Sequence, residues 1–331
     1  MPLPITLKEV DFDSIGFFSE RLQLVLMSPR LPVIIDLSSI KFCEPEQFAI
    51  IALVLKDFKN KKNFTVEFKI GEQNQISKVI GYLSHVGFFD FLGLNYGNLI
   101  GSARGSNTYI PISEISESHL FNTYSEYKAT LQDFIEEEAQ KLTRILLKSS
   151  ERTQNFLIIT YSIREAIRNA LEHSETGVCY VCAQSWNNGK AQIIIMDEGI
   201  GIYKSLQQAN IKNLDNNNFL RLAIEPGVSR TNNLSALENI HDNSGYGLYV
   251  LYHVARSFGR LVISSSQKYL VVTKDKKEFE GSFSHTGTLI ALTFESYPND
   301  SRDIINMIVQ SGEEEAAAQG RNKSSVRSKS L

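Results

Sequence analysis

Cysteine is scarce in this sequence. Its 331 residues include three cysteines, an odd number without the spacing of a disulfide framework. Cys179 and Cys182 form a C-x-x-C pair, a spacing that elsewhere binds zinc or exchanges electrons. The surrounding GVCYVCAQSW predicts a strand, on which residues three apart face opposite sides, and no second Cys or His pair lies nearby in the sequence. We therefore interpret both cysteines as structural.

Long apolar runs and an excess of one charge are also missing. The longest apolar run, Phe48 to Leu55, is too short to cross a bilayer, and the N-terminus lacks the pattern of a secretory signal. With 34 basic and 37 acidic residues, the net charge of -3 gives no indication of a nucleic-acid coat or a membrane-binding surface. The content of 42% hydrophobic and 21% charged residues is typical of globular proteins. We expect a cytoplasmic protein that binds neither nucleic acid nor membrane.

Residues 1–100 are predicted to form a small α/β unit. Short apolar or alternating runs predict strands, and dense apolar faces predict helices, the last of which ends at Gly87. The predicted elements are a strand at 32–37, a helix at 48–58, a strand at 63–70 and a helix at 76–86.

Two further regions flank the second half of the chain. Residues 101–118 are rich in Ser, Gly, Asn and Pro and are predicted to be a linker. An amphipathic helix is expected over 127–147, either covering the next domain or acting as a dimerisation or signalling rod, so a homodimer stays open. The polar tail, 297–331, is predicted to be disordered.

A predicted helix over 155–173 carries the first chemical pattern. Glu165 and Asn169 lie four residues apart and therefore share one face of the helix. An amide oxygen suits Mg²⁺, which takes few protein ligands when phosphates supply the rest. The carboxylate could instead act on a nucleophile beside the metal. By itself, E-x-x-x-N on a helix is common and is more typical of an ordinary surface than of a metal site.

The second pattern comes directly after an apolar strand at 191–196. Asp197 precedes Gly199 and Gly201, and glycines allow the backbone to approach a flat ring closely. A carboxylate only accepts hydrogen bonds, whereas the exocyclic amine of adenine donates them. A tight turn after a buried strand is the alternative interpretation.

Two glycine motifs complete the series. Gly245 and Gly247 open a predicted helix that ends at Gly259, and a glycine-rich loop at a helix N-terminus can bind polyphosphate. Thr288 starts a strand after Gly287, which puts a hydroxyl at the strand start. The sequence contains neither a P-loop motif nor the glycine pattern of a dinucleotide fold.

The order E-x-x-x-N-A, D-x-G-x-G-I, G-x-G-L, G-T resembles the GHKL superfamily of ATP-binding domains over roughly residues 151–296. The resemblance implies an α/β sandwich with a mixed sheet on one side and helices on the other. It implies Mg²⁺ at Asn169, adenine at Asp197, Gly199, Gly201 and Thr288, and phosphates at Gly245 and Gly247. The stretch 203–244 would be the ATP lid.

Glu165 indicates which branch of the GHKL superfamily the sequence resembles most. An acid four residues before the metal-binding Asn, in the string REAIRNALEHS, is most similar to the anti-sigma-factor serine kinases and unlike sensor histidine kinases. In that branch Glu165 would be the catalytic base.

The N-terminal unit has a second resemblance. The string VIIDLSSIKFCEPEQFAIIALVLKDFKNKKNFTVEF is similar to STAS domains, the fold of anti-sigma-factor antagonists. Those antagonists carry a phosphorylated Ser or Thr where this chain reads Cys43 to Gln47, so the acceptor hydroxyl is absent.

The sequence therefore predicts a two-domain regulatory protein that binds ATP and Mg²⁺ and acts on a protein partner or substrate. A serine/threonine kinase or ATPase is one interpretation of the second half. A non-catalytic module, in which ATP controls partner binding, is the other.

Overall fold

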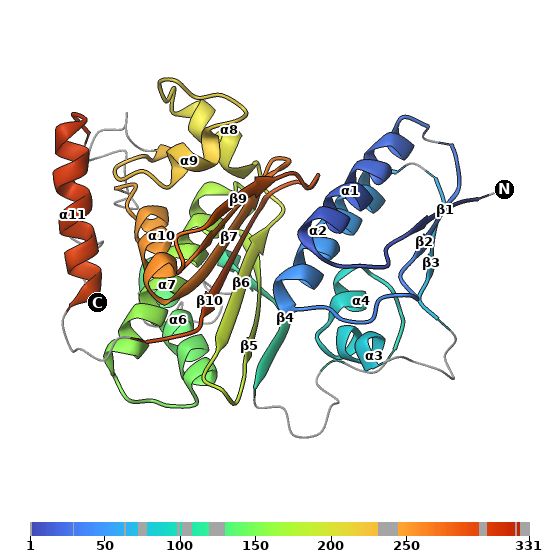
Figure 1. Cartoon of the computed structure of the whole chain (residues 1–331), viewed down its shortest axis with the longest axis horizontal. Coiled ribbons are helices and arrows are strands. Elements are labelled where there is room, and N and C mark those ends of the chain that lie inside the picture. The colour runs from blue at the N-terminus through green and yellow to red at the C-terminus, as the bar shows by residue number, and fades with distance from the viewer. Residues whose placement is uncertain are drawn as a thin grey trace.

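A computed structural model describes residues 2–28, 30–62, 64–71, 78–97, 100, 108–118, 130–230, 244–297, 303–321 and 323–324. Within these residues the chain is mixed α/β, with one parallel sheet of three strands and one antiparallel sheet of seven. Figure 1 shows the layers in order across the molecule: the small sheet, helices, the large sheet, and further helices.

The N-terminal unit contains the parallel sheet β1-β2-β3 and helices that lie between it and the large sheet (Figure 1). Pro45 at the first turn, together with a capping box between Glu44 and Gln47, sets the start of its longest helix. The predicted strands and helices of this unit are confirmed, with the residues before 78 in the last helix outside the described part. Its elements are β1 (Leu3–Thr6), α1 (Phe12–Leu26), β2 (Val33–Asp36), α2 (Pro45–Lys61), β3 (Val66–Lys69), α3 (Lys78–His85) and α4 (Phe88–Phe91).

The second half of the chain builds the large sheet and the helices on its inner face. The predicted helices and strands at 155–173, 191–196 and 248–258 and the strand starting at Thr288 are confirmed. The elements are β4 (Tyr109–Ser116), α6 (Leu131–Leu147), α7 (Gln154–His173), β5 (Val178–Ser185), β6 (Ala191–Asp197), α8 (Gly201–Gln208), α9 (Phe219–Ala223), α10 (Gly247–Phe258), β7 (Gly259–Ser265), β8 (Lys268–Thr273), β9 (Glu278–Gly281), β10 (Thr288–Phe294) and α11 (Ile304–Ala318).

The large sheet corrects the expectation of a mixed sheet. Its strand order is β4-β5-β6-β10-β7-β8-β9, and each of these pairs is antiparallel. The helices between β6 and β7 return the chain in the same direction, as in a parallel crossover. However, β10 runs the opposite way between those two strands, so that no parallel pair forms there.

Two predicted boundaries were wrong. Part of the expected linker is β4, an edge strand paired with β5, and residues 101–107 lie outside the described part. Part of the expected disordered tail is α11, which buries Ile305, Val309 and Ala316 against the core. In both regions a mostly polar sequence contains a short apolar pattern, and its residues are buried against elements that are distant in the sequence.

The two faces of the large sheet belong to two apolar cores. The inner core includes α6, α7, α10 and α11, and the outer core joins the sheet to the N-terminal unit. The C-x-x-C pair confirms the predicted alternation, because Cys179 lies in the inner core and Cys182 in the outer core. Among the residues described, no helix has the length and apolar character needed to span a membrane.

Candidate functional site

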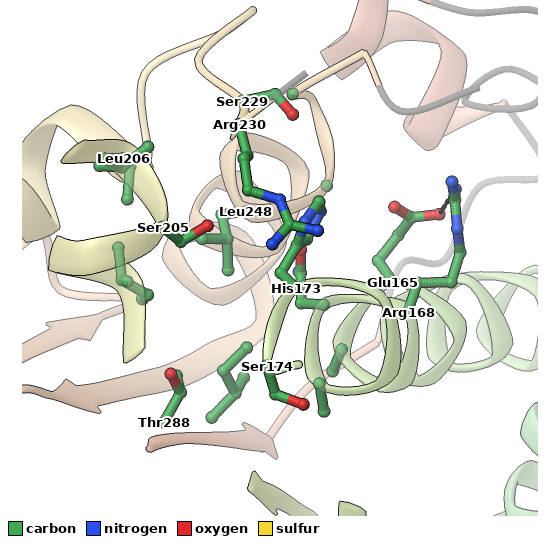
Figure 2. A pocket seen from close by; sticks show the side chains of 18 of the residues that line it. Glu165, Arg168, His173, Ser174, Ser205, Leu206, Ser229, Arg230, Leu248 and Thr288 are labelled. Carbon is green, nitrogen blue, oxygen red and sulfur yellow. Dashed lines mark hydrogen bonds and ion pairs between the residues drawn. The ribbon is translucent and has the colours of Figure 1, made fainter. Parts of the chain in front are cut away.

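A cavity lies where α7, α8 and the start of α10 meet the ends of β6 and β10. Its open space, including the solvent-filled mouth, is about 900 Å³. Figure 2 shows Glu165 and Arg168 on α7, Thr288 at the strand start, and Arg230 reaching across toward His173. Seven of the eight site residues predicted from the sequence line this cavity: Glu165, Asn169, Asp197, Gly201, Gly245, Gly247 and Thr288.

The strand register explains why residues far apart in sequence meet here. Thr288 of β10 is paired with Asp197 of β6 on one side and with Ser265 of β7 on the other. The Ser265 hydroxyl accepts from the N–H of Ile202 at 2.9 Å and donates to the carbonyl of Gly287 at 3.0 Å. Ser265 therefore ties three segments of the cavity wall together, and no sequence motif marked it.

Asp197 is the most strongly perturbed acid of the site. Its side chain is 3% exposed and accepts a 2.8 Å hydrogen bond from the N–H of Gly199. Burial raises the pKa of the Asp197 carboxyl to about 7, although the N–H groups of Gly199 and Thr288 act in the opposite direction. An acceptor at this depth suits a ligand donor such as an amine.

The two glycines that follow Asp197 are packed closely against other protein atoms. A Cβ at Gly199 would lie 2.1 Å from the carbonyl oxygen of Ser174, so Gly199 is required for packing and does not line the cavity. Gly201 has a φ of +76°, and its Cβ would lie 2.8 Å from the Ser265 hydroxyl. The space beside these two glycines, where a flat ring was expected, is thus occupied largely by other atoms of the chain.

The glycine loop before α10 is held in the same way. Gly245 has a φ of +77° and would place a Cβ 2.7 Å from the backbone of Val228. A Cβ at Gly247 would lie 2.7 Å from Oε2 of Glu165. The first turn of α10, whose N-cap Tyr246 makes no side-chain capping bond, therefore lies directly against the wall of the cavity formed by α7.

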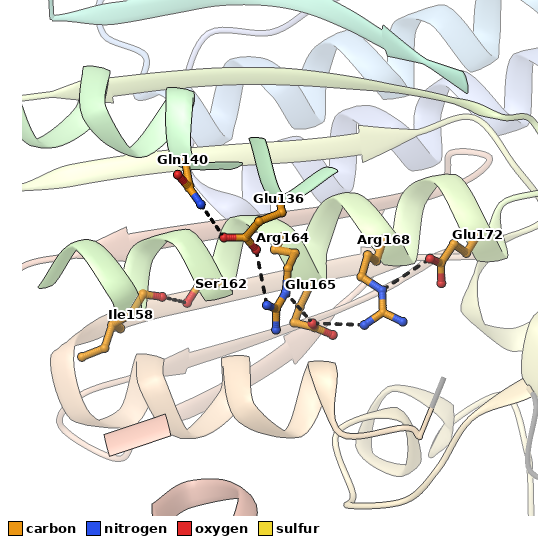
Figure 3. A network of polar contacts seen from close by, with 8 residues as sticks. All are labelled: Glu136, Gln140, Ile158, Ser162, Arg164, Glu165, Arg168 and Glu172. Carbon is orange, nitrogen blue, oxygen red and sulfur yellow. Dashed lines mark hydrogen bonds and ion pairs between the residues drawn. The ribbon is translucent and has the colours of Figure 1, made fainter. Parts of the chain in front are cut away.

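Glu165 lies in a row of charges along α7, shown in Figure 3. Its Oε1 accepts from Arg164 Nε at 3.2 Å and from Arg168 Nη1 at 3.3 Å. Arg168 also donates to Glu172 at 3.4 Å. Burial by itself disfavours the charge of Arg168, but Glu165 and Glu172 hold the pKa of its guanidinium above the ordinary value. Glu165 is therefore an anion shared between two guanidinium groups.

Asn169 supplies a test of whether the site fits a ligand. Its Nδ2 is buried and, in the described part of the chain, makes no hydrogen bond. A buried amide without a partner costs free energy, and the cost is removed when a ligand or its water supplies the partner. Since the two ends of an amide are assigned from their surroundings, the side chain could equally turn its oxygen to a cation. The donor set therefore fits a Mg²⁺ nucleotide. No group of three or more His, Cys, Asp or Glu suited to a metal occurs among the described residues.

Sequence reasoning missed the cations of the cavity. Arg168 and Arg230 line it together with Ser229 and Ser244. Arg230 donates to the carbonyl of Glu172 at 3.0 Å and pairs with Glu175 at 3.2 Å. Arg168 directly precedes Asn169 in the sequence, so its place on the helix was available as a signal. Arg230 lies in the expected lid, where no local pattern marked it.

The expected lid, 203–244, is helical over part of its length. It includes most of α8 and all of α9, which bury Leu206, Phe219 and Leu220 in the inner core. Asp215 heads the asparagine run and accepts from the N–H groups of Asn217 and Asn218. Residues 231–243 lie outside the described part.

No known family's model matches the sequence, and no curated protein matches it. Among solved structures, the crystal structure of full-length ShkA in complex with AMPPNP matches with 12% identity and a TM-score of 0.28. The match covers 94% of this chain and 54% of ShkA, so the chain spans about half the length of that protein. A similarity at this level assigns neither fold nor function.

Proposed function

We propose that this chain is a regulatory protein that binds ATP with Mg²⁺ in the cavity between α7 and α10, in a domain of the GHKL type. The observation that carries the proposal is the convergence of four separate motifs. Glu165, Asn169, Asp197, Gly245 and Thr288 come from distant parts of the sequence and line one cavity. A chance set of short motifs would be scattered over the fold.

The chemistry of the lining divides the cavity into two ends. At the strand ends, the buried Asp197 would accept from the adenine amine, with Thr288 beside it. At the other end, Arg168 and Arg230 with the first turn of α10 would receive the phosphates. Asn169 would hold Mg²⁺ through its amide oxygen, and the bound cation would neutralise phosphate charge.

Turnover with Glu165 as base is one candidate for the step after binding. A general base must be able to reach and accept a proton. Oε2 of Glu165 is directed to Gly247 at the cavity, whereas Oε1 is shared by two arginines. A kinase or ATPase would use Oε2.

A non-catalytic module controlled by ATP is the second candidate. It is favoured by the pairing of Glu165 with Arg164 and Arg168, since a carboxylate in that position holds Arg168 in place for a phosphate. The N-terminal unit, proposed to be STAS-like, would then connect the nucleotide state to a protein partner. Its Cys43 to Gln47 segment has no hydroxyl to phosphorylate.

The test is calorimetry on the full chain with ATP, in the presence and absence of Mg²⁺. Asn169→Ala is expected to lose the Mg²⁺-dependent part of the affinity. Asn155→Ala, on the first turn of the same helix and outside the cavity lining, is the matched control and should bind as wild type. Absence of ATP binding by the wild type, or equal behaviour of the two variants, would refute the proposal.

A further inference from the structure

Two neighbouring residues of α2 reach the turns at the strand end of the cavity from behind the sheet. Lys56 Nζ lies 2.8 Å from Oε2 of Glu198, the residue after Asp197. Asp57 Oδ1 accepts from the N–H of Thr286 at 3.2 Å and from the Thr286 hydroxyl. Thr286 lies two residues before Thr288. One helix of the N-terminal unit thus contacts both turns that carry cavity residues.

The two turns are packed against each other. A Cβ at Gly287 would lie 1.9 Å from the carbonyl oxygen of Asp197 and 2.8 Å from Cα of Glu198. Asp197 and Thr288 are also a register pair of β6 and β10. Because there is no free space between the turns, a shift of either one moves the carboxylate and the hydroxyl at the strand end of the cavity.

The side chains of α2 are themselves held in place. The Lys56 ammonium lies 4.0 Å from the ring centroid of Phe91 and 4.8 Å from that of Tyr180. Asp57 is 4% exposed, and its second oxygen pairs with Lys61 at 2.7 Å. Neither side chain can follow a moving turn, so each fixes the turn that it contacts.

The segment before Thr288 has further anchors on the same side. The N–H of Ser284 donates to the hydroxyl of Ser19 on α1 at 2.7 Å. His285 is buried, with Nε2 2.7 Å from the Ser264 hydroxyl and Nδ1 2.9 Å from the carbonyl of Thr286. The segment is therefore held by the N-terminal unit at Ser284 and Thr286 and by β7 at His285.

We propose that Lys56 and Asp57 are positioning residues for the nucleotide base, through which the N-terminal unit sets the affinity and base preference of the cavity. The inference rests on the proposed function. It makes the N-terminal unit a regulatory element, since a partner that shifts the Lys56 or Asp57 side chain changes the position of the turn that this side chain contacts. By reciprocity, a bound adenine nucleotide stabilises the docked position of α2.

The experiment compares ATP and GTP binding to the full chain by calorimetry. A carboxylate held at the base position accepts from the adenine amine, whereas guanine presents an oxygen acceptor at that point. Lys56→Met and Asp57→Ala are each expected to weaken ATP about tenfold, a loss of about 1.4 kcal/mol, and to leave GTP within about twofold. Lys56→Arg keeps the ion pair and should restore wild-type ATP affinity. Equal losses for ATP and GTP would indicate general damage and would overturn the proposal.

The matched control is Lys59→Met, because Lys59 lies on the same helix and donates to the carbonyl of Leu92 within the N-terminal unit. It should bind ATP as wild type. If Asp57→Ala does not fold, the partly exposed Lys56 site decides the question. Unchanged ATP affinity in Lys56→Met overturns the inference and leaves the proposed function standing.

If the wild type binds no ATP, the proposed function fails. Hydrogen exchange then tests independently whether Lys56 fixes the positions of the two turns. The amides of residues 197–202 and 286–288 should exchange faster in Lys56→Met than in wild type or Lys59→Met. Identical exchange in all three proteins would overturn the positioning role.

Discussion

The two faces of the large sheet are both buried, but they are built differently. Ile193 and Ile195 of β6 belong to the inner core, whereas Ile194 and Met196 belong to the outer core. A strand covered on both faces is apolar at consecutive positions instead of alternating. The run AQIIIM therefore indicates that both faces of β6 are packed against other elements. The structure identifies the element on the outer face as α2 of the N-terminal unit.

The polar groups on the two faces differ in whether they lie at the cavity. On the outer face, Glu46 is 1% exposed and pairs with Arg260 at 2.7 Å, while Gln192 donates to Glu46 at 3.2 Å and to Thr293 at 2.7 Å. On the inner face, the Nδ2 of Asn169 makes no hydrogen bond within the described chain. The outer face also holds buried atoms without a hydrogen bond among the described residues, Gln192 Oε1 and Arg260 Nε, but neither residue lines the cavity, whereas Asn169 does. The unpartnered group that a ligand can reach is therefore on the inner face.

Removal of residues 1–100, which cover the outer face of the large sheet, is expected to have the largest effect. The fragment 101–331 would expose the outer apolar face, including Cys182, Ile194, Met196, Val262 and Leu289. We expect loss of the folded state, seen as aggregation and absence of a cooperative thermal transition by circular dichroism, because exposed patches of this kind drive association. The full chain is the control. A soluble fragment that unfolds cooperatively at the wild-type temperature would show that the two units are separable.

A matched pair of neighbours separates stability from binding. Ile194→Ala and Ile195→Ala each remove a fully buried side chain, one from each core, and each should lower the free energy of unfolding by about 2–5 kcal/mol in urea titrations. Ile195 lines the cavity and Ile194 does not. Only Ile195→Ala should therefore weaken ATP at temperatures where both variants are folded. Equal ATP affinities would show that the cavity wall tolerates loss of the inner-face side chain.

The smallest expected effect is a pH dependence that originates on the inner face. Asp197 has a folded-state pKa of about 7, above its unfolded value of 3.8, so the native state binds more protons between these values. Its contribution to stability is complete below pH 3.8 and is lost as the pH rises through about 7, with a slope of at most about 1.4 kcal/mol per pH unit.

The measurement is the unfolding free energy of wild type and Asp197→Asn from pH 5 to pH 8. Burial also raises the pKa of Glu46 on the outer face, so the difference between the two proteins isolates Asp197. That difference should move in favour of the variant as the pH rises to 7 and then stay level. A constant difference over the whole range would mean that Asp197 is ionised throughout.

Local patterns predicted the parts of the fold that depend on near neighbours. The 3.6-residue periodicity of 155–173 and the apolar run at 191–196 appear as α7 and β6 with nearly the expected bounds. Polar composition gave a wrong prediction where a few apolar residues are buried against distant elements, as in β4 and α11. The candidate site residues of the four motifs could be proposed from sequence because each motif is local, and seven of the eight line one cavity, whereas Ser265 and Arg230 belong to no local pattern.

The sequence by itself indicated the helices α2, α3, α6, α7 and α10, the strands β2, β3, β5, β6 and β10, and the candidate residues of each motif, since hydrophobic period and glycine placement act over a few residues. Only the tertiary structure decided how the motifs meet. The insertion of β10 between β6 and β7 sets Thr288 beside Asp197 and Ser265, and the packing of α2 brings Lys56 to Glu198. These pairings join residues separated by 23 to 142 positions, such as Thr288 with Ser265 and Lys56 with Glu198. They depend on which distant elements cover the two faces of one sheet, and no short window of sequence records that choice.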